Sequence, residues 1–345
     1  MRVLVIGGTG FIGPHVVRLL SEQGHDLTVF NRGRFQADLP ASVRRISGER
    51  AALPTFRAEL ARLAPDVVLD MYAMTAADAR VVVDALAGIA RRAVAISSQD
   101  VYRAYGRLRG VEPGPPDPVP LDEDSSLRER LYPYRGETPR AGDDPERWAD
   151  DYDKIPVERM YLSRTDLPGT ILRLPAVYGP GDNQHRLHEH LKRMDDCRPA
   201  ILLDERAAGW RWTRGYVEDV AAAIALAVTD ERAAGRVYNA GEPEAYSARD
   251  WVRRIADAAG WNGRIIVAAP PDRLPASLRF DLNTTQDLVS DSSRIRRELG
   301  YAERVPPGEA LARTIAWERA HPPADPRPFD YVAEDAALAA LDGVS

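Results

Sequence analysis

Lysine is nearly absent from this sequence. Of its 46 basic residues only Lys154 and Lys192 are lysines, and all the others are arginines. This bias is typical of GC-rich coding, and it makes each lysine a candidate for a position that arginine cannot fill. Cysteine occurs once, at Cys197, which excludes an internal disulfide and suits a reducing compartment. We therefore expect a cytoplasmic protein.

Long apolar runs and an excess of positive charge are also missing. The longest apolar run, Val220 to Val228, is too short to span a bilayer, and the first strand begins too early for a signal peptide. The net charge of −6 argues against nucleic-acid binding. Neither a membrane nor a nucleic acid is expected as a partner. With 345 residues, 44% of them hydrophobic, the chain has room for one large or two moderate domains.

A glycine-rich turn follows the first apolar run. The run Val3–Ile6 predicts a buried strand, and a segment of helical periodicity comes after the turn. A strand, a glycine turn and a helix in this order predict a dinucleotide-binding site. Gly7 would allow the tight turn, Gly10 the approach of a pyrophosphate, and Gly13 the close packing of the helix. The helix N-terminus offers unpaired N–H groups to the phosphates. The candidates in this turn are Gly7, Thr9, Gly10, Phe11, Ile12 and Gly13.

The end of the second strand, Leu27–Phe30, bears on the choice of cofactor. An acidic residue at this place would bond the ribose 2′-hydroxyl of NAD, but Asn31 and Arg32 stand there, with Arg34 close by. A guanidinium can bind a 2′-phosphate at two points. We therefore expect NADP to be favoured, with NAD as the alternative if Arg32 is only a solvated loop residue.

Strands and helices alternate along the first 240 residues. Apolar runs at 66–70, 93–96 and 169–174 are separated by helix-like segments, which predicts an α/β fold with a parallel sheet covered on both faces. Ligands of such sheets bind at the carboxyl ends of the strands, where Ser97–Tyr102 follows one of these runs. The proline-rich residues 103–150 predict a functional flap or a disordered loop.

Together these motifs resemble those of the extended short-chain dehydrogenases/reductases, in the NAD-dependent epimerase/dehydratase group. The matching pieces, in the order of the family, are Gly7–Gly13, Ser97–Tyr102, Lys154 with Glu158, Arg173–Asp182, 217–221, 238–241 and 291–301. The resemblance implies a doubly wound Rossmann domain at 1–175 and 212–240, a smaller substrate domain at 176–211 and 241–330, and a tail at 331–345. It also implies Met71, Lys154 and Pro175 as cofactor contacts.

The activity that the resemblance implies is hydride transfer between a nicotinamide cofactor and a sugar-like or small hydroxyl or carbonyl substrate. The enzyme would be an oxidoreductase, or an epimerase or dehydratase with transient oxidation at carbon. Its partner would be this small-molecule substrate; a homodimer is left open, and no metal site is predicted.

The chemistry of the family uses a serine or threonine, a tyrosine and a lysine. Ser98 stands at the serine position, but Tyr152 and Lys154 are two residues apart where the family has four. On one helix the two side chains would be rotated by about 200° from each other. Pro156 is tolerated only in the first turn of a helix, so we expect the helix to begin near Asp153. Tyr152 would then lie on the preceding loop, free to turn into the site.

The proton donor therefore stays open in the sequence. Lys154 could bond the nicotinamide ribose and lower the pKa of a neighbouring phenol. If Tyr152 is only a packing aromatic, another acid must act in its place. The alternatives are Asp150, Tyr102 and the tyrosines of the proline-rich segment 103–150, namely Tyr105, Tyr132 and Tyr134.

The substrate side also departs from the family. An arginine usually lies seven residues before the aspartate that matches Asp219, but Trp212 stands there, with Arg211 and Arg214 nearby. These shifted arginines weaken the case for a nucleotide-sugar substrate. The broken Tyr–Lys spacing leaves a second hypothesis, a non-catalytic NADP-binding sensor or partner-binding protein. The substrate-binding candidates are Ser98, Tyr102, Arg211 and Arg214.

Overall fold

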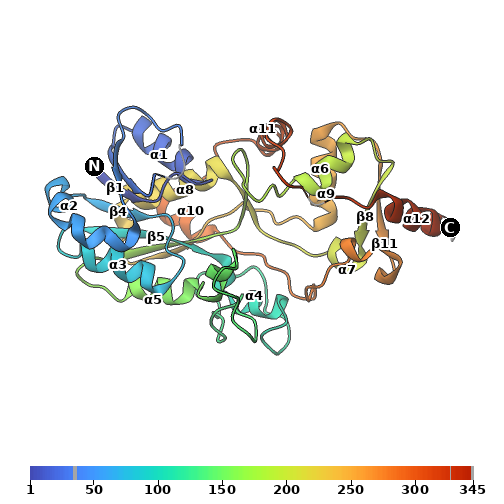
Figure 1. The fold of residues 1–345 in the computed structure, drawn as a ribbon, viewed down its shortest axis with the longest axis horizontal. Coiled ribbons are helices and arrows are strands. Elements are labelled where there is room, and N and C mark those ends of the chain that lie inside the picture. The colour runs from blue at the N-terminus through green and yellow to red at the C-terminus, as the bar shows by residue number, and fades with distance from the viewer. Residues whose placement is uncertain (34–36, 327, 343–345) are drawn as a thin grey trace.

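The computed structural model describes residues 1–33, 37–326 and 328–342. Within these residues the chain forms a seven-stranded parallel sheet in the order β10-β6-β5-β4-β1-β2-β3 (Figure 1). The strands are β1 (Arg2–Ile6), β2 (Asp26–Asn31), β3 (Arg44–Ser47), β4 (Val67–Asp70), β5 (Arg92–Ser98), β6 (Gly169–Leu174) and β10 (Val237–Asn239). The strand order reverses next to β1, which confirms the predicted doubly wound α/β fold.

Helices cover both faces of the sheet. The helices are α1 (Gly13–Glu22) and α8 (Val217–Thr229) on one face, and α2 (Arg57–Leu63), α3 (Ala76–Leu86) and α5 (Lys154–Leu162) on the other. Successive side chains of a strand point to opposite faces. Val3 and Val5 accordingly join the core beneath α1 and α8, whereas Leu4 and Ile6 join the core beneath α3. Both faces are buried beneath helices, which explains the continuous apolar runs of the strands.

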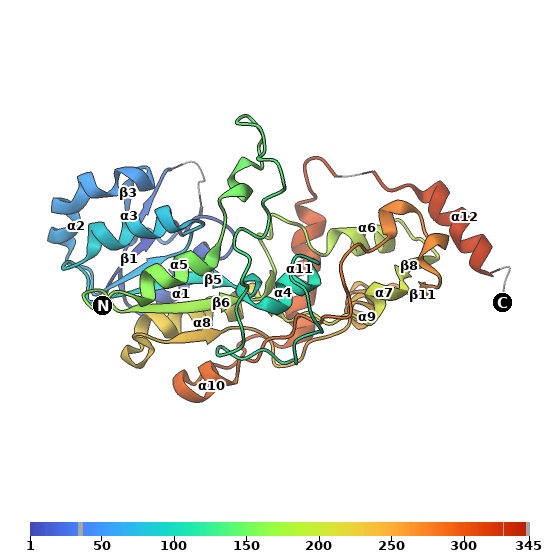
Figure 2. The ribbon, with the colours of Figure 1, turned by 90° about the horizontal axis from the view of Figure 1, so that it is seen from below.

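A smaller part of the molecule lies beyond the carboxyl ends of the sheet strands (Figure 2). It is built on the parallel pair formed by β8 (Ala200–Asp204) and β11 (Arg264–Ala268). Its helices are α6 (His188–Asp195), α7 (Glu205–Ala208), α9 (Ala248–Ala259) and α12 (Tyr331–Asp342). The last of these lies within the predicted tail and is held by a buried ion pair between Glu334 and Arg193. The predicted domain boundaries stay a prediction.

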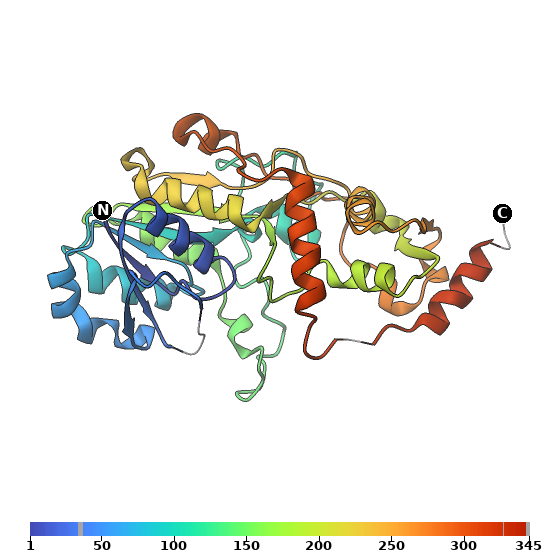
Figure 3. The ribbon, with the colours of Figure 1, turned by 90° about the horizontal axis from the view of Figure 1, so that it is seen from above.

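Further elements lie beside or between the two parts. The short pair β7 (Ala176–Tyr178) and β9 (Arg214–Tyr216) continues from the edge of the large sheet. Helix α10 (Ser293–Leu299) packs on β10 and α8, while α11 (Pro307–Ala320) stands between the two parts and contacts α9 (Figure 3). Helix α4 (Arg103–Leu108) begins the long segment that leads to α5. Residues 109–153 of this segment are called the flap below. The flap extends from the edge of the large sheet that is formed by the carboxyl ends of its strands (Figure 2).

Candidate active site

The glycine turn has the geometry of a phosphate cradle. Gly7 and Gly8 adopt φ of +92° and +78°, a region that side chains disfavour. A Cβ atom on Gly13 would lie 2.4 Å from the carbonyl carbon of Gly8, so α1 packs directly on the turn. A Cβ atom on Gly10 would meet nothing within 4 Å. The turn therefore leaves open space before the N-terminus of α1, and its residues fit the pyrophosphate of a dinucleotide.

The predicted adenosine side of this site lies at the end of β2. The amide of Asn31 donates to the Thr9 hydroxyl at 3.4 Å, which ties the end of β2 to the glycine turn. The exposed Arg32 Nε lies 3.9 Å from Oε2 of Glu49, a residue that follows β3. Arg34 lies outside the described residues. Sequence reasoning missed Glu49, because it is brought beside Arg32 only by the pairing of β3 with β2.

Lys154 is buried at the first position of α5. The Asp153 side chain accepts a hydrogen bond from the Ile155 amide at 2.8 Å and caps the helix, so the helix begins where Pro156 requires. The Lys154 ammonium donates to the carbonyls of Ala73 and Ile96 at 2.6 and 3.1 Å. Burial lowers the pKa of Lys154 to about 8. Because an ammonium has three N–H groups, one remains for a ligand.

Tyr152 reaches Lys154 from the residues that precede the helix. The centroid of its ring lies 5.8 Å from Lys154 Nζ, and the Ser98 hydroxyl contacts its phenol. The structure thus brings Ser98, Tyr152 and Lys154 together, although the two-residue spacing would separate the latter two on a helix. The Tyr152 hydroxyl donates to Asp100 Oδ2 at 2.8 Å. Burial and the charge of Asp100 raise the pKa of Tyr152 well above its ordinary value.

Asp100 is the residue of this cluster that sequence reasoning missed. It lies two residues beyond Ser98, to whose hydroxyl its own amide donates at 3.2 Å. Its carboxyl also accepts from the hydroxyl of Tyr134, a flap residue, at 3.3 Å. The only signal in the sequence was its place within the polar stretch that ends β5. The ring of Tyr134 packs on that of Tyr152 with centroids 5.3 Å apart, which closes the site from the flap side.

Two of the alternative proton donors are engaged elsewhere. Asp150 accepts hydrogen bonds from the backbone and the guanidinium of Arg140, and the backbone bond above all lowers the pKa of Asp150, so this carboxylate stays ionised. Tyr102 is fully buried; its hydroxyl donates to Asn239 Oδ1 at 2.6 Å and accepts from Arg173 at 3.1 Å. Burial leaves no face of the Tyr102 side chain open in this structure, and its substrate role stays a prediction.

Tyr102 instead belongs to a buried framework beneath the site. Arg173 and Glu158 form an ion pair at 2.8 Å, and the Ser97 hydroxyl donates to Glu158 at 2.6 Å. Asn239 accepts from the Tyr102 hydroxyl and donates to the Leu121 carbonyl at 3.0 Å. Its members, called the framework network below, are Ser97, Tyr102, Glu158, Arg173 and Asn239.

The two substrate-side arginines point to other partners. Arg211 pairs with Asp287 at 2.7 Å. Arg214 is partly buried under the ring of Trp251, 4.4 Å from its centroid, and donates to the Trp212 carbonyl at 3.2 Å. Burial lowers the pKa of Arg214 to about 10. In the described residues Arg211 gives Nε and Nη2 to Asp287, and Arg214 gives Nη1 to the carbonyls of Trp212 and Tyr246, so neither presents its whole guanidinium to a pyrophosphate.

A comparison with models of known protein families shows to which family the chain belongs. The model of the NAD dependent epimerase/dehydratase family matches residues 3–104 and 131–241, which is more than half of the chain. The chain belongs to this family.

Relatives of this epimerase/dehydratase family member include two reductases. The 2′-dehydrokanamycin reductase of Streptomyces kanamyceticus is 29% identical over 89% of this chain and 79% of its own length. The 3-diazoavenalumate denitrifying reductase of a Streptomyces species is 28% identical, over 89% of this chain and 97% of its own.

Solved structures share the fold. MoeE5 in complex with UDP-glucuronic acid and NAD gives a TM-score of 0.66 at 21% identity, covering 93% of this chain and 99% of that one. The UDP-glucose 4-epimerase of Thermotoga maritima gives 0.66 at 18%, with the same coverage. Membership of the family confirms the predicted class of enzyme, an oxidoreductase or epimerase/dehydratase that uses a nicotinamide dinucleotide.

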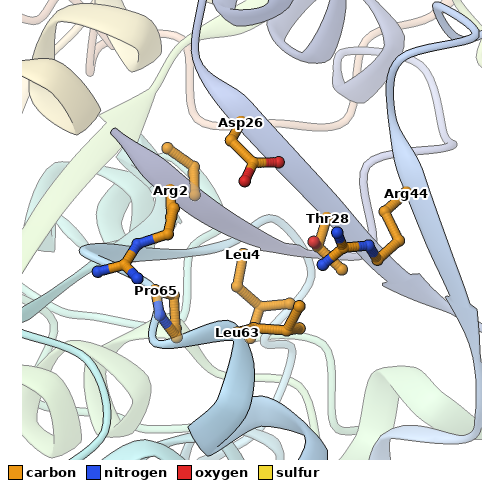
Figure 4. Close-up of a pocket in the computed structure, with 8 residues that line it drawn as sticks. Arg2, Leu4, Asp26, Thr28, Arg44, Leu63 and Pro65 are labelled. Carbon is orange, nitrogen blue, oxygen red and sulfur yellow. The ribbon is translucent and has the colours of Figure 1, made fainter.

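Other features of this family member lie away from the site. The cavity in Figure 4 is lined by Arg2, Asp26 and Thr28 near the amino ends of β1 and β2, opposite the glycine turn. Its volume of about 10 Å³ has room for one water, so it takes no substrate.

Among the described residues, no helix is long and apolar enough to cross a bilayer.

Proposed function

We propose that this enzyme reduces a carbonyl group of a sugar-like substrate that carries no nucleotide diphosphate, with a preference for NADPH. The proposal rests on one observation above all, the convergence of Ser98, Tyr152 and Lys154 at the carboxyl edge of the sheet. Two relatives that match 89% of the chain are reductases, which supports net reduction over redox-neutral epimerisation.

The roles of the three side chains follow from what each can donate. When bound, the nicotinamide supplies the hydride, and the protein supplies orientation and a proton. The Ser98 hydroxyl holds the substrate oxygen, and the Tyr152 phenol protonates it as the new hydroxyl forms. The Lys154 ammonium uses its remaining N–H for the ribose, since its other two are held by the carbonyls of Ala73 and Ile96. The rings of Tyr134 and Trp148 pack on Tyr152 and exclude water.

The arginines support the substrate class. A nucleotide diphosphate is bound best by an exposed guanidinium, whereas Arg211 is paired with Asp287 and Arg214 is partly buried beneath Trp251. A ketone on a sugar or aminosugar ring makes no such demand.

The preference for NADP rests on Arg32. This guanidinium follows β2, where the adenosine ribose of a bound dinucleotide is expected, and its side chain is about half exposed. Glu49 works against the preference, because a carboxylate 3.9 Å from Arg32 would repel a 2′-phosphate.

The test is a turnover assay with purified protein. Keto derivatives of sugars and aminosugars, UDP-glucose and UDP-galactose would each be incubated with NADPH or NADH while nicotinamide absorbance is followed. We expect consumption of NADPH equal to the ketone reduced, and loss of turnover in Ser98→Ala and Tyr152→Phe. Turnover of the UDP-sugars without net change in absorbance would contradict the proposal. Dinucleotide binding without turnover of any substrate would support the sensor hypothesis instead.

A further inference from the structure

Asp100 holds a carboxyl group in an environment that supplies few hydrogen-bond donors. The residue is 4% exposed. The phenols of Tyr152 and Tyr134 both donate to Oδ2, at 2.8 and 3.3 Å. In the described part of the chain, no group hydrogen-bonds to Oδ1. A buried polar atom without a partner costs free energy, so this site is not built for stability alone.

The cations around Asp100 are engaged with other groups. Arg128 donates through Nε to the backbone carbonyl of Asp100 and through Nη2 to Asp153, at 3.0 Å. Lys154 donates to two backbone carbonyls. Burial therefore raises the pKa of Asp100, although the Tyr152 bond and the charges of Arg128 and Lys154 act against it; Asp153 adds to the rise. A carboxyl of this kind is able to hold a proton above the ordinary aspartate range.

A line of hydroxyl groups leads from Asp100 toward the surface. Tyr105 donates to the Tyr134 hydroxyl at 2.9 Å, and Tyr134 donates to Asp100. Both tyrosines are partly exposed, and the guanidinium of Arg109 lies 5.7 Å from the Tyr134 ring centroid. The hydrogen-bonded order is therefore Tyr152, Asp100, Tyr134, Tyr105, from the buried cluster outward.

We propose that Asp100 relays the proton that Tyr152 gives to the substrate, taking the place of the helical Tyr–Lys arrangement that this chain lacks. The proposal rests on the proposed reduction. For each carbonyl reduced, the phenolic O–H of Tyr152 breaks as the substrate O–H forms. The carboxyl O–H of Asp100 then breaks as the phenol is restored. Asp100 regains its proton from water by way of Tyr134 and Tyr105, and the electrons come from the hydride of the reduced nicotinamide.

The rival explanation is that Asp100 only holds Tyr152 in place. Asp100→Asn separates the two, because an amide of the same shape keeps a hydrogen bond to the phenol but cannot hold a transferable proton. The relay predicts a loss in kcat of about 100-fold, typical of general acid catalysis, with KM little changed. A purely positioning role predicts a kcat near that of the wild type.

The pH profile sharpens the test. In the wild type, kcat/KM for reduction should fall as pH rises through the raised pKa of Asp100, because the protonated carboxyl is the active form. Asp100→Asn should lose this limb and keep the limb at higher pH that belongs to Lys154. Tyr134→Phe should lower kcat severalfold by interrupting the supply of protons. Tyr331→Phe serves as the control and should change nothing, because the Tyr331 hydroxyl donates to Asp196 at the surface of the smaller part.

A second measurement does not depend on turnover. In ¹³C-aspartate-labelled protein, the carboxyl signal that Asp100→Asn removes should titrate above the ordinary aspartate pKa of about 3.9. Titration at or below this value would overturn the relay, as would an Asp100→Asn enzyme with the rate and pH profile of the wild type. If no substrate is reduced, the proposed function fails, while the titration still shows whether Asp100 holds a proton. If Asp100→Asn does not fold, the comparison of Tyr134→Phe with Tyr331→Phe decides.

Discussion

Two buried polar networks lie side by side at the end of β5, and they differ in how completely their groups are paired. In the framework network, Arg173 spreads its donors over Glu158, Tyr102 and the Glu123 carbonyl, at 2.8 to 3.1 Å. In the cluster of Asp100, Tyr152 and Lys154, one carboxylate oxygen has no partner among the described residues. Fully paired networks fix a fold, whereas incompletely paired groups are typical of sites that await a ligand or move a proton.

Strand β5 and the residues after it serve both networks by turning successive side chains in different directions. Ser97 donates to Glu158 in the framework network, while Ser98 contacts the phenol of Tyr152. Asp100 lies with the second cluster and Tyr102 with the first. The six residues from Ser97 to Tyr102 therefore include two members of the framework network and two members of the active cluster. Only their tertiary contacts show which residue belongs to which.

The largest effect is expected from breaking the framework network. Glu158→Gln removes the counter-charge of the Arg173 guanidinium. Because the Glu158 side chain is only 3% exposed, water cannot take its place beside the buried guanidinium. Removing one partner of a buried ion pair costs about 3–5 kcal/mol of stability. Urea unfolding should show this loss.

The matched control for this change is an ion pair at the surface. Glu309→Gln breaks the exposed contact with Arg313 and should leave the unfolding midpoint close to that of the wild type. If Glu158→Gln were as stable as this control but inactive, the framework network would have a catalytic role and the comparison above would fail.

The next effect concerns activity with the fold retained. Lys154→Met removes the ammonium of the active cluster but keeps an apolar stem of similar length. We expect kcat to fall by about 100-fold or more, with a far-UV circular dichroism spectrum like that of the wild type. Lys192→Met is the control, because Lys192 is the other lysine of the chain and forms an ion pair with Asp196 at the surface, near the end of α6.

The pH dependence of this lysine has a defined sign. Burial lowers the pKa of Lys154 to about 8 from an ordinary value of 10.5, so the ammonium is present below pH 8 and is lost above it. Wild-type activity should decline as pH rises through about 8. Because the folded pKa lies below the unfolded one, burial of the charge costs stability below pH 8. This cost should fade between pH 8 and 10.5 as the unfolded state alone stays protonated. Activity that holds steady to pH 10 would show that the charge is not needed.

Much of this arrangement follows from local sequence patterns. Neighbouring residues alone are enough to predict the apolar strands and the glycine turn. The turn is recognised by the apolar run before Gly7 and by the spacing of Gly7, Gly10 and Gly13. The start of α5 was predictable as well, because Pro156 fits only a first turn and so releases Tyr152 from the helix.

Other parts depend on contacts between distant segments. Asp100 meets Tyr134 from 34 residues away, and the flap that carries Tyr134 has no periodicity from which its path could be predicted. Strand β3, with the sequence Arg-Arg-Ile-Ser, is too short and polar to be recognised without its partner β2. Because β3 was missed, so was Glu49 beside Arg32, and this omission bears directly on the choice of cofactor.

The smallest effect is expected at Arg32 and Glu49, the pair that bears on the choice of cofactor. We predict that the wild type binds NADP about tenfold more tightly than NAD, since a charged hydrogen bond contributes roughly 1.5–3 kcal/mol and Glu49 offsets part of it. Arg32→Ala should reduce this ratio by weakening NADP alone. Glu49→Gln should increase it, because the neutral amide no longer repels a 2′-phosphate. The measurement is titration of both cofactors against the three proteins, with Arg62→Ala, an exposed arginine of α2, as the control. Equal binding of the two cofactors by the wild type, unchanged in both variants, would show that neither side chain reaches the adenosine ribose.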